Sequence, residues 1–368
     1  DFSQMMQNEN NIRLLDFDVN NGTNQLFYYN TQEKTIYRTR LAESFEKNTE
    51  SSKHKPILRG TFAGLSVDWL NRKLYLTNIE QNSIEVSDYE GSIRSTIIDS
   101  SSSANNFGEQ LGQITVVPTA NDNQGLIFWL EESSMEEYYR LRSANLDGSN
   151  IKTLYTSRQN YGQIEAFAVD PIKNLIYFYV FIESWRSAGS IIPGAPTNSH
   201  IMAIDFNGSE KSKRIIATSE IAGKKFDRVN SMTVFNGDIY LTSHDSYSAH
   251  LSTIVWVVDA NSGSYAQSIL AQKNEIFSLG IVHESLQSLS PKLSGNSRVA
   301  LDYKRPVCSS KCKFLCISGK CINPPGYSTF GRVHDVIIAS RPADEIAEQS
   351  VKTYIWSLKN QKQLIPGM

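Results

Sequence analysis

The fold is decided by one stretch, AGLSVDWLNRKLYLTNIEQNSIEVSDYEGSIRSTII, which runs from Ala63 to Ile98. It predicts four short β-strands separated by tight turns, at Gly64–Trp69, Lys73–Thr77, Ser83–Ser87 and Ser92–Ile98. Strands this short, with turn signals so close together, pair with their neighbours in the chain and form an antiparallel meander. A single meander cannot bury both of its faces, so it needs copies of itself to pack against.

Copies of this pattern occur at four other places in the chain. Each copy has a strand of small and apolar residues, then a turn and a strand with an aromatic marker. The markers are Phe27, Tyr75, Phe128, Tyr177 and Tyr240, separated by steps of 48, 53, 49 and 63 residues. Steps of this size suit one four-stranded propeller blade with loops of variable length.

The motifs of the second copy resemble a known family. Gly64–Trp69 (GLSVDW) followed by Leu74–Asn78 (LYLTN) is similar to the YWTD repeat of propellers of the low-density lipoprotein receptor type. The family motif reads YLTN from Tyr75, FWLE from Phe128, YFYV from Tyr177 and YLTS from Tyr240, so the aspartate that the family uses between blades is missing from these copies. The resemblance covers roughly residues 10–325. It implies an all-β fold, a six-bladed β-propeller of four-stranded antiparallel blades with an EGF-like module after it.

This resemblance divides the chain into three parts. Residues 1–300 are expected to form the propeller, as five full blades and the inner strand of a sixth at 276–283. Residues 306–327 correspond to a truncated EGF-like module. Residues 332–368 contain three more strand-like stretches, which complete the sixth blade from the C-terminal side or begin a further propeller. Because a three-stranded piece without a partner is only marginally stable, closure of the sixth blade is favoured.

All four cysteines lie in one short segment, at Cys308, Cys312, Cys316 and Cys321. Clustered cysteines form either a disulfide framework or a zinc site, and these spacings are not the Cys-x-x-Cys knuckles typical of zinc. The segment resembles the first half of an EGF-like module, and the resemblance implies the pairs Cys308–Cys316 and Cys312–Cys321. The family's fifth and sixth cysteines are absent. Disulfides imply an oxidising compartment.

Composition and sequons are consistent with an extracellular or cell-surface protein. A net charge of −2 over 368 residues gives no general attraction to nucleic acid or anionic membranes. The longest apolar run, Leu175–Ile182, is too short to span a bilayer, so any membrane contact is expected through segments outside this chain. Two N-glycosylation sequons begin at Asn21 and Asn207, both in predicted turns. The chain begins with Asp1, so we expect a processed protein or a piece of a longer one.

Three aspartates at the ends of predicted inner strands are the candidates for catalytic chemistry. Six-bladed propeller hydrolases hold a metal ion in the central channel, and Asp18, Asp68 and Asp170 would be its oxygen ligands here. The alternative is that each aspartate opens the turn to the next strand. The turn role is favoured because Pro118 and Phe235 replace aspartate in the third and fifth copies.

Two loops and two histidines are candidates for partner binding. Trp185 and Arg186 lie in the longest insertion, and this residue pair is typical of interface hot spots, although Trp185 could instead cover a blade edge. The acidic run that contains Glu131, Glu132, Glu136 and Glu137 would meet a basic partner or remain a solvated loop. His244 and His250 are candidates for sensing acid pH, against the simpler role of surface histidines.

The sequence as a whole predicts a non-catalytic protein-binding module. It would dock a protein ligand or partner subunit across loops at one rim, without a cofactor, and the resemblance implies a role in receptor ligand binding or in matrix adhesion. A secreted propeller hydrolase with a channel metal and a structural subunit of a larger surface assembly are the alternatives. No phosphate-binding loop, nucleophile elbow or basic aromatic surface for nucleic acid is present in the sequence.

Overall fold

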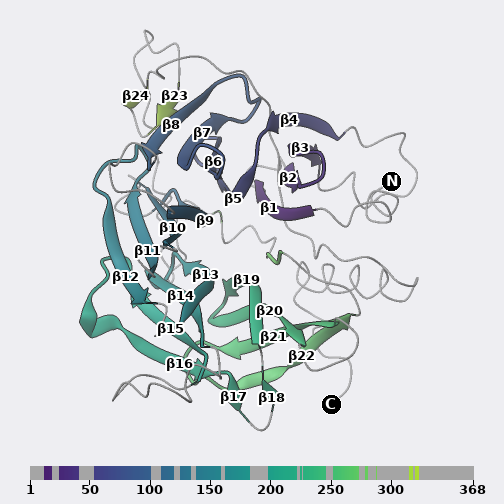
Figure 1. Cartoon of the computed structure of the whole chain (residues 1–368), viewed down its shortest axis with the longest axis vertical. Coiled ribbons are helices and arrows are strands. Elements are labelled where there is room, and N and C mark those ends of the chain that lie inside the picture. The colour runs from purple at the N-terminus through teal and green to yellow at the C-terminus, as the bar shows by residue number, and fades with distance from the viewer. Residues whose placement is uncertain are drawn as a thin grey trace, which may run out of the picture.

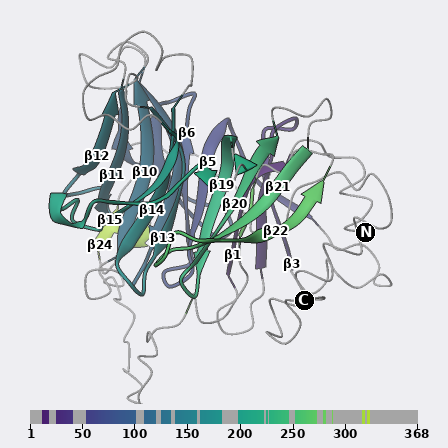
Figure 2. The same ribbon diagram turned by 90° about the horizontal axis from the view of Figure 1, so that it is seen from below.

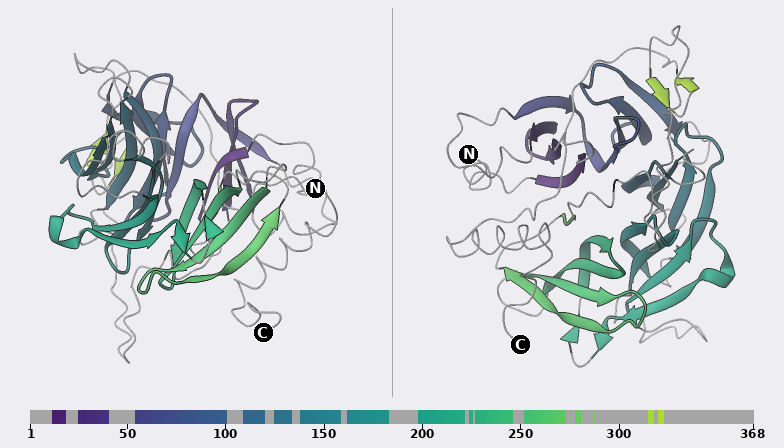
Figure 3. Two further views of the ribbon diagram at one scale, coloured as in Figure 1. Left: turned by 60° about the horizontal axis from the view of Figure 1, so that its bottom comes forward. Right: turned by 180° about the vertical axis from the view of Figure 1, so that it is seen from behind.

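The computed structural model describes residues 12–18, 25–40, 54–100, 109–119, 125–133, 138–158, 162–182, 198–221, 224–225, 227–245, 252–272, 278–280, 287, 315–317 and 320–322. Within these ranges, five four-stranded antiparallel sheets stand around a common centre as the blades of a β-propeller (Figure 1). Figure 2 shows the strands running between the two faces of the ring, and Figure 3 shows the ring from behind.

Each blade is a meander of four strands that follow one another in the sequence, with the first strand nearest the centre. Blades one and two contain β1 (Ile12–Asp18), β2 (Gln25–Asn30), β3 (Thr35–Arg40), β4 (Lys55–Arg59), β5 (Phe62–Asp68), β6 (Lys73–Asn78), β7 (Ser83–Asp88) and β8 (Arg94–Asp99). Blades three and four contain β9 (Glu109–Val117), β10 (Leu126–Ser133), β11 (Tyr138–Asn145), β12 (Lys152–Arg158), β13 (Gln163–Asp170), β14 (Leu175–Phe181), β15 (His200–Asp205) and β16 (Arg214–Thr218). Blade five contains β19 (Asp227–Phe235), β20 (Asp238–Asp245), β21 (Ser252–Asp259) and β22 (Tyr265–Gln272).

The second blade confirms the four strands predicted from Ala63–Ile98, with boundaries shifted by one or two residues. Its turns have the backbone conformation that short hairpins need. Arg72 and Asn82 have φ angles of 56° and 46°, and Gly91 has a φ of 63°. Left-handed residues at these positions turn the chain back within a few residues, so each strand pairs with the next one.

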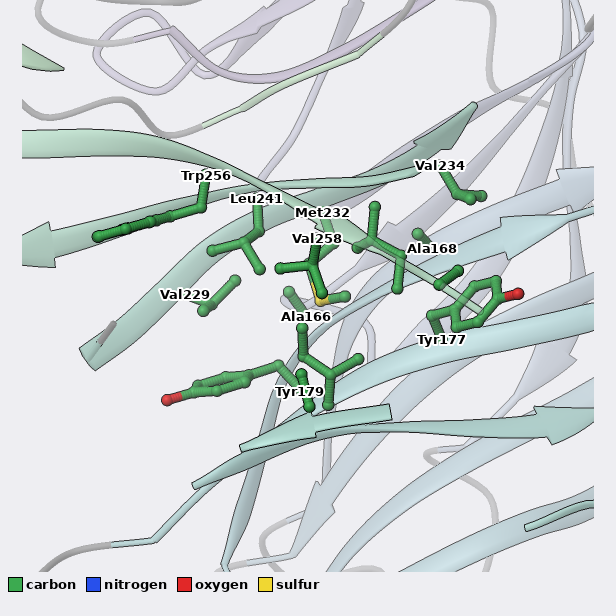
Figure 4. Close-up of a cluster of buried hydrophobic side chains, with 14 of the residues drawn as sticks. Ala166, Ala168, Tyr177, Tyr179, Val229, Met232, Val234, Leu241, Trp256 and Val258 are labelled. Atoms are coloured by element: carbon green, nitrogen blue, oxygen red, sulfur yellow. The ribbon is translucent and has the colours of Figure 1, made fainter. Parts of the chain in front are cut away.

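The core lies between the blades rather than within them. Leu74 and Leu76 of β6 pack toward blade one, whereas Tyr75 between them packs toward blade three. Each of the four buried clusters joins residues from two consecutive blades, and Figure 4 shows the one between blades four and five. Because side chains alternate along a strand, the strand presents apolar side chains to the blades on both of its sides. This confirms that each meander depends on its copies.

All five aromatic markers are buried in the second strands of their blades. Phe27, Tyr75, Phe128 and Tyr177 have no exposed surface, and Tyr240 is 7% exposed. The Tyr75 hydroxyl reaches across to blade three and donates a hydrogen bond to the carbonyl oxygen of Leu146 (3.0 Å). The repeated aromatic position therefore fills the space between blades.

The predicted sixth blade requires a correction, because the described residues form five blades. Neighbouring inner strands contact one another in the order β1, β5, β9, β13 and β19. Of the predicted inner strand at 276–283, the structure describes residues 278–280, which lie near the centre of the ring without regular structure (Figure 1). They have no strand partner among the described residues, and a β-strand needs a hydrogen-bonded ladder. Residues 332–368 lie outside the described ranges.

The predicted EGF-like module is also not shown. The described part of residues 306–327 is one short hairpin of β23 (Leu315–Ile317) and β24 (Lys320–Ile322). An EGF-like module is completed by a third disulfide, for which this chain lacks the fifth and sixth cysteines.

The remaining described elements are small. They are a 3₁₀ turn, η4 (Glu210–Ser212), and a two-stranded sheet of β17 (Glu220–Ile221) and β18 (Lys224–Lys225). Among the residues that the structure describes, no helix has the length and apolar character needed to cross a membrane.

Candidate functional site

The inner strands of the five blades surround a central cavity of about 1020 Å³. Residues 278–280 and Gln287 also contribute to its wall. The wall is mixed in polarity. Its polar side chains on inner strands that keep some exposed surface include Asp16, Gln113, Thr115, Glu165, Asn230, Ser231 and Thr233.

Polar side chains on the inner strands connect each blade to the next through main-chain hydrogen bonds. Asp16 of β1 accepts hydrogen bonds at Oδ2 from the Val67 amide (2.7 Å) and the Ser66 hydroxyl (3.0 Å), both on β5. Ser66 in turn accepts a hydrogen bond from the Val116 amide on β9 (3.0 Å). Blades one, two and three are thus linked in series at the cavity wall.

The series continues through blades three, four and five. The side-chain amide of Gln113 on β9 donates to the Phe167 carbonyl (2.9 Å) and accepts from the Phe167 amide (3.0 Å) on β13. Glu165 on β13 accepts a hydrogen bond from the Val229 amide on β19 (2.8 Å). Each of these inner strands therefore satisfies a main-chain group of its neighbour, which fixes the spacing of the blades.

Leu279 and Gln287 extend this series from blade five and to blade one. Ser231 on β19 accepts a hydrogen bond from the Leu279 amide (2.9 Å). The Gln287 side chain is buried and donates to the Phe17 carbonyl on β1 (2.6 Å). Among the described residues, 278–280 and Gln287 thus contact the inner strands of blades five and one without forming a strand.

Two of the carboxylates on the cavity wall, Asp16 and Glu165, have different surroundings. Glu165 forms an ion pair with Arg228 (2.9 Å), and the Arg228 guanidinium also lies over the ring of Phe181. Asp16 forms hydrogen bonds but no ion pair with any described residue. Burial raises the pKa of Asp16 to about 6, while hydrogen bonds from Val67, Phe17 and Ser66 act in the opposite direction.

The three aspartates considered for a channel metal have structural roles instead. Asp68 accepts hydrogen bonds from the main-chain and side-chain amides of Asn71, and Asp170 accepts from the amides of Ile172 and Lys173. Both therefore hold the turn to the next strand, as the turn interpretation predicted. Burial raises the pKa of Asp68 to about 6.

Asp18 differs from the other two aspartates, because it links blades one and two. The Tyr89 hydroxyl of blade two donates a hydrogen bond to its Oδ2 (3.0 Å). None of the three aspartates lines the cavity, and no group of His, Cys, Asp and Glu among the described residues has the geometry of a metal site. The channel-metal hypothesis therefore loses the residues on which it was based.

The acidic run in blade three is only partly a surface feature. Glu131 is buried in β10 and pairs with Arg140 (3.3 Å) and Arg142 (2.8 Å) of β11. Glu132 is exposed and accepts a hydrogen bond from the Tyr139 hydroxyl (3.1 Å). The expectation that both would be solvated or meet a partner is therefore wrong for Glu131, whose charge is neutralised within the blade.

The other predicted contact residues lie outside the described ranges, but the strands that flank them are described. Glu136 and Glu137 fall between β10 and β11, Trp185 and Arg186 between β14 and β15, and His250 between β20 and β21. All three connections join a second strand to a third strand. In this meander they share one face of the ring, at which the first strands begin with Ile12, Phe62, Glu109, Gln163 and Asp227. We call this side the entry face and the opposite side the exit face.

Of the remaining predicted histidine and glycosylation sites, some lie within the described residues. His244 lies in β20 near the entry face, opposite Asp227 of β19. Asn207 is exposed in the turn after β15, at the exit face, where its amide donates to Asp205 (3.0 Å), so the sequon is accessible. Asn21 lies outside the described residues.

Two of the four cysteines are described, at Cys316 in β23 and Cys321 in β24. They are directly opposite each other in the ladder. Cys308 and Cys312 lie outside the described residues, so the pairs Cys308–Cys316 and Cys312–Cys321 stay predictions.

Sequence reasoning missed the residues that join the inner strands. Asp16, Gln113, Glu165 and Ser231 are the main members of that set. The sequence carries only a weak signal for them, since other polar residues such as Arg13 and Asn230 lie on the same strands and the four residues do not share one position of the repeat.

Comparisons with known proteins agree on the fold. No family model matches the chain. A chain in the crystal structure of the nidogen/laminin complex superposes with a TM-score of 0.50 at 15% identity, covering 70% of this chain and 79% of that one. A luciferin-regenerating enzyme gives 0.51 at 10% identity, covering 74% and 80%. The calcium-binding protein regucalcin from Agrobacterium tumefaciens gives 0.47 at 9% identity, covering 71% and 74%. At these identities the first two similarities support the propeller fold and leave the function open.

Proposed function

We propose that this chain is a non-catalytic, extracellular protein-binding propeller that docks a protein ligand or partner subunit on its entry face. The observation behind this proposal is the convergence of connections on one face. The insertion with Trp185 and Arg186 and the connection with Glu136 and Glu137 join strand ends on the same side of the ring. Loops presented by a rigid scaffold are the usual place for such binding.

Charged side chains at the same end of the cavity are consistent with a polar protein partner. Arg228 is about half exposed, and Glu132 and Arg13 are exposed. Both signs of charge are present, which suits recognition by complementary pairs rather than attraction to a polyanion. One of the solved structures with a similar fold is described as a complex of nidogen with laminin, which adds a precedent for protein binding by this architecture.

Affinity capture tests this proposal. The tagged chain is incubated with extracellular material from its source, and captured proteins are identified by mass spectrometry. We expect a captured protein to be lost with the double substitution Trp185→Ala and Arg186→Ala, because truncation of central aromatic and arginine contacts removes most interface energy. The matched control is Ile172→Asp on the exit face, where Ile172 is 59% exposed. Capture that survives the first variant and is lost with the control would place the interface on the wrong face and contradict the proposal.

Acid-dependent release is a further part of this proposed function. His244 lies in β20 near the entry face, and His250 follows in the connection to β21. Protonation of either residue between neutral and mildly acid pH would add positive charge beside the docking surface. The affinity for a captured protein is measured at both pH values in the wild type and in His244→Ala and His250→Ala. Equal ratios of affinity in all three would rule this role out.

The alternatives have less support. A secreted hydrolase with a channel metal would need several oxygen ligands that converge in the cavity. Asp68 and Asp170 are occupied by turn amides, and Asp16 and Glu165 accept hydrogen bonds from amides of neighbouring inner strands. One calcium ion per chain in metal analysis of the purified protein would reverse this preference. A structural subunit of a surface assembly would use the same faces without releasing its partner.

A further inference from the structure

The carboxylate of Asp16 is the distinctive group of the central cavity. It lies on the wall and is held by the Val67 amide, the Ser66 hydroxyl and the Phe17 amide. All three are neutral donors, and no described cation pairs with it. Glu165, on the opposite side of the hydrogen-bonded series, has Arg228 as its ion-pair partner.

A carboxylate in this position is unfavourable for the folded chain. Burial raises the pKa of Asp16, and the nearby negative charge of Asp18 raises it further. The other charged side chains on the cavity wall are Arg13 of β1, Lys34 of the β2–β3 turn, Glu131 and Glu132 of β10, Arg140 of β11, and the Glu165–Arg228 pair. β9 presents uncharged groups to the cavity. A bound cation would supply the missing charge, because an opposite charge stabilises a desolvated carboxylate.

The rest of the wall defines the size and polarity of the guest. The cavity volume of about 1020 Å³ is of the size of small-molecule sites in proteins. Thr115, Asn230 and Thr233 keep exposed surface on this wall and offer hydroxyl and amide groups. These groups suit a guest that makes neutral hydrogen bonds in addition to one charge contact.

We propose that the central cavity is a binding site for a small organic cation, in which Asp16 binds an ammonium or guanidinium group and the threonine and asparagine side chains bind the rest of the guest. The guest is either a free amine or the lysine or arginine side chain of a protein. The site is separate from the proposed docking on the entry-face loops, since the groups that would hold the guest, Asp16, Thr115, Asn230 and Thr233, lie on inner strands. It holds whether or not the loops bind a protein.

Titration of the whole chain with defined probes tests this site. Isothermal calorimetry with n-butylammonium and agmatine measures binding of free amines, and capped lysine and arginine peptides report side-chain binding. Butanol is the neutral control. We expect Asp16→Asn to weaken cation binding at least about tenfold, since it removes the charge and keeps an acceptor for Val67. The matched variant is Glu165→Gln, which we expect to change affinity by less than about threefold, because Glu165 is already paired.

The wild-type chain provides a test that does not depend on the folding of a variant. With a pKa of about 6, Asp16 is mostly ionised at pH 7 and mostly protonated at pH 5. Cation affinity should therefore fall about tenfold between these two pH values, and in Asp16→Asn this fall should be absent.

The results of these titrations show whether the cation is a free amine or a protein side chain. They also distinguish the cavity site from the proposed docking on the entry face. Binding of free amines, or of the peptides alone, supports the site and identifies the source. No binding by either, or equal affinity in the wild type and Asp16→Asn, overturns it. The double variant Trp185→Ala and Arg186→Ala should leave amine affinity unchanged, so loss of protein docking and loss of the cation site are distinguishable.

Discussion

Two junctions between neighbouring blades are held together by opposite means. Between blades two and three, β5 approaches β9 so closely that a Cβ on Gly64 would lie 2.8 Å from the Gly112 oxygen and the Ile114 nitrogen. Between blades four and five, Glu165 bridges to the Val229 amide and pairs with Arg228. The first junction depends on the absence of a side chain, and the second on a charged one. Steric exclusion cannot be screened by solvent, so the two should respond very differently to substitution.

The junction between blades one and two lies between these extremes. Asp16 bridges to β5 as Glu165 bridges to β19, but without a cation. The desolvation of its charge therefore offsets part of the stabilisation from the hydrogen bonds that it accepts. This junction should be the one whose strength changes with pH.

The largest effect is expected at the sterically tight junction. Gly64→Ala should lower the free energy of unfolding by about 3 kcal/mol, because main-chain atoms of β9 would have to move. The matched control is Gly112→Ala, whose Cβ would meet Leu130 at an ordinary distance of 3.4 Å. Chemical denaturation of both variants measures the difference. Similar losses would show that the approach of β5 to β9 is not the limiting contact.

The next effect concerns the pH dependence of the Asp16 junction. The pKa of Asp16 is raised in the folded state to about 6, above the unfolded value of 3.8, so its folded form binds more protons in this range. The free energy of unfolding should therefore increase as pH falls from about 7 to about 4, by at most about 3 kcal/mol for this group. In Asp16→Asn this contribution should vanish. Asp68 contributes in the same direction and should retain its share.

Denaturation curves at pH 7, 5.5 and 4.5 measure this difference in the wild type, Asp16→Asn and Glu165→Gln. Glu165→Gln should keep the wild-type increase. An Asp16→Asn protein that gains as much stability in acid as the wild type would remove Asp16 as the source.

A smaller effect is expected from the hydroxyl that supports the tight junction. The buried Thr77 side chain donates a hydrogen bond to the Gly112 carbonyl (2.7 Å). Thr77→Val keeps the shape and removes the donor, which should cost about 1 kcal/mol. Thermal unfolding of Thr77→Val beside Thr77→Ser, which keeps the donor, checks this. A larger loss in the serine variant would indicate that the methyl group, not the hydroxyl, is important.

The smallest effect is expected at the charged junction. Arg228 is 47% exposed on its side chain, so solvent screens its pair with Glu165. Arg228→Gln should lower the free energy of unfolding by about 0.5 kcal/mol, and less at high salt. Melting temperatures at low and high ionic strength measure it. A loss comparable to that of Gly64→Ala would contradict the contrast between the two junctions.

Local sequence signals predict some strands and side-chain positions of this chain and not others. Ala63–Ile98 predicted its four strands because its turns and alternation are local properties of short segments. The fourth strand of blade one, Lys55–Arg59, carries no such turn signal, because a long charged connection separates it from β3. Glu131 was expected at the surface because a run of glutamates does not show which member faces a neighbouring strand.

The sequence by itself determined a ring of repeated four-stranded sheets, since the period and the aromatic markers are written in the order of residues. Only the tertiary structure decided which polar residues bridge the blades, because Asp16 and Val67 are far apart in the chain and meet only when the ring forms. The pKa of Asp16 is likewise a property of its enclosure, and no sequence pattern encodes enclosure. The number of blades also depended on packing, since residues 278–280 reach the inner position without pairing as a strand within the described chain.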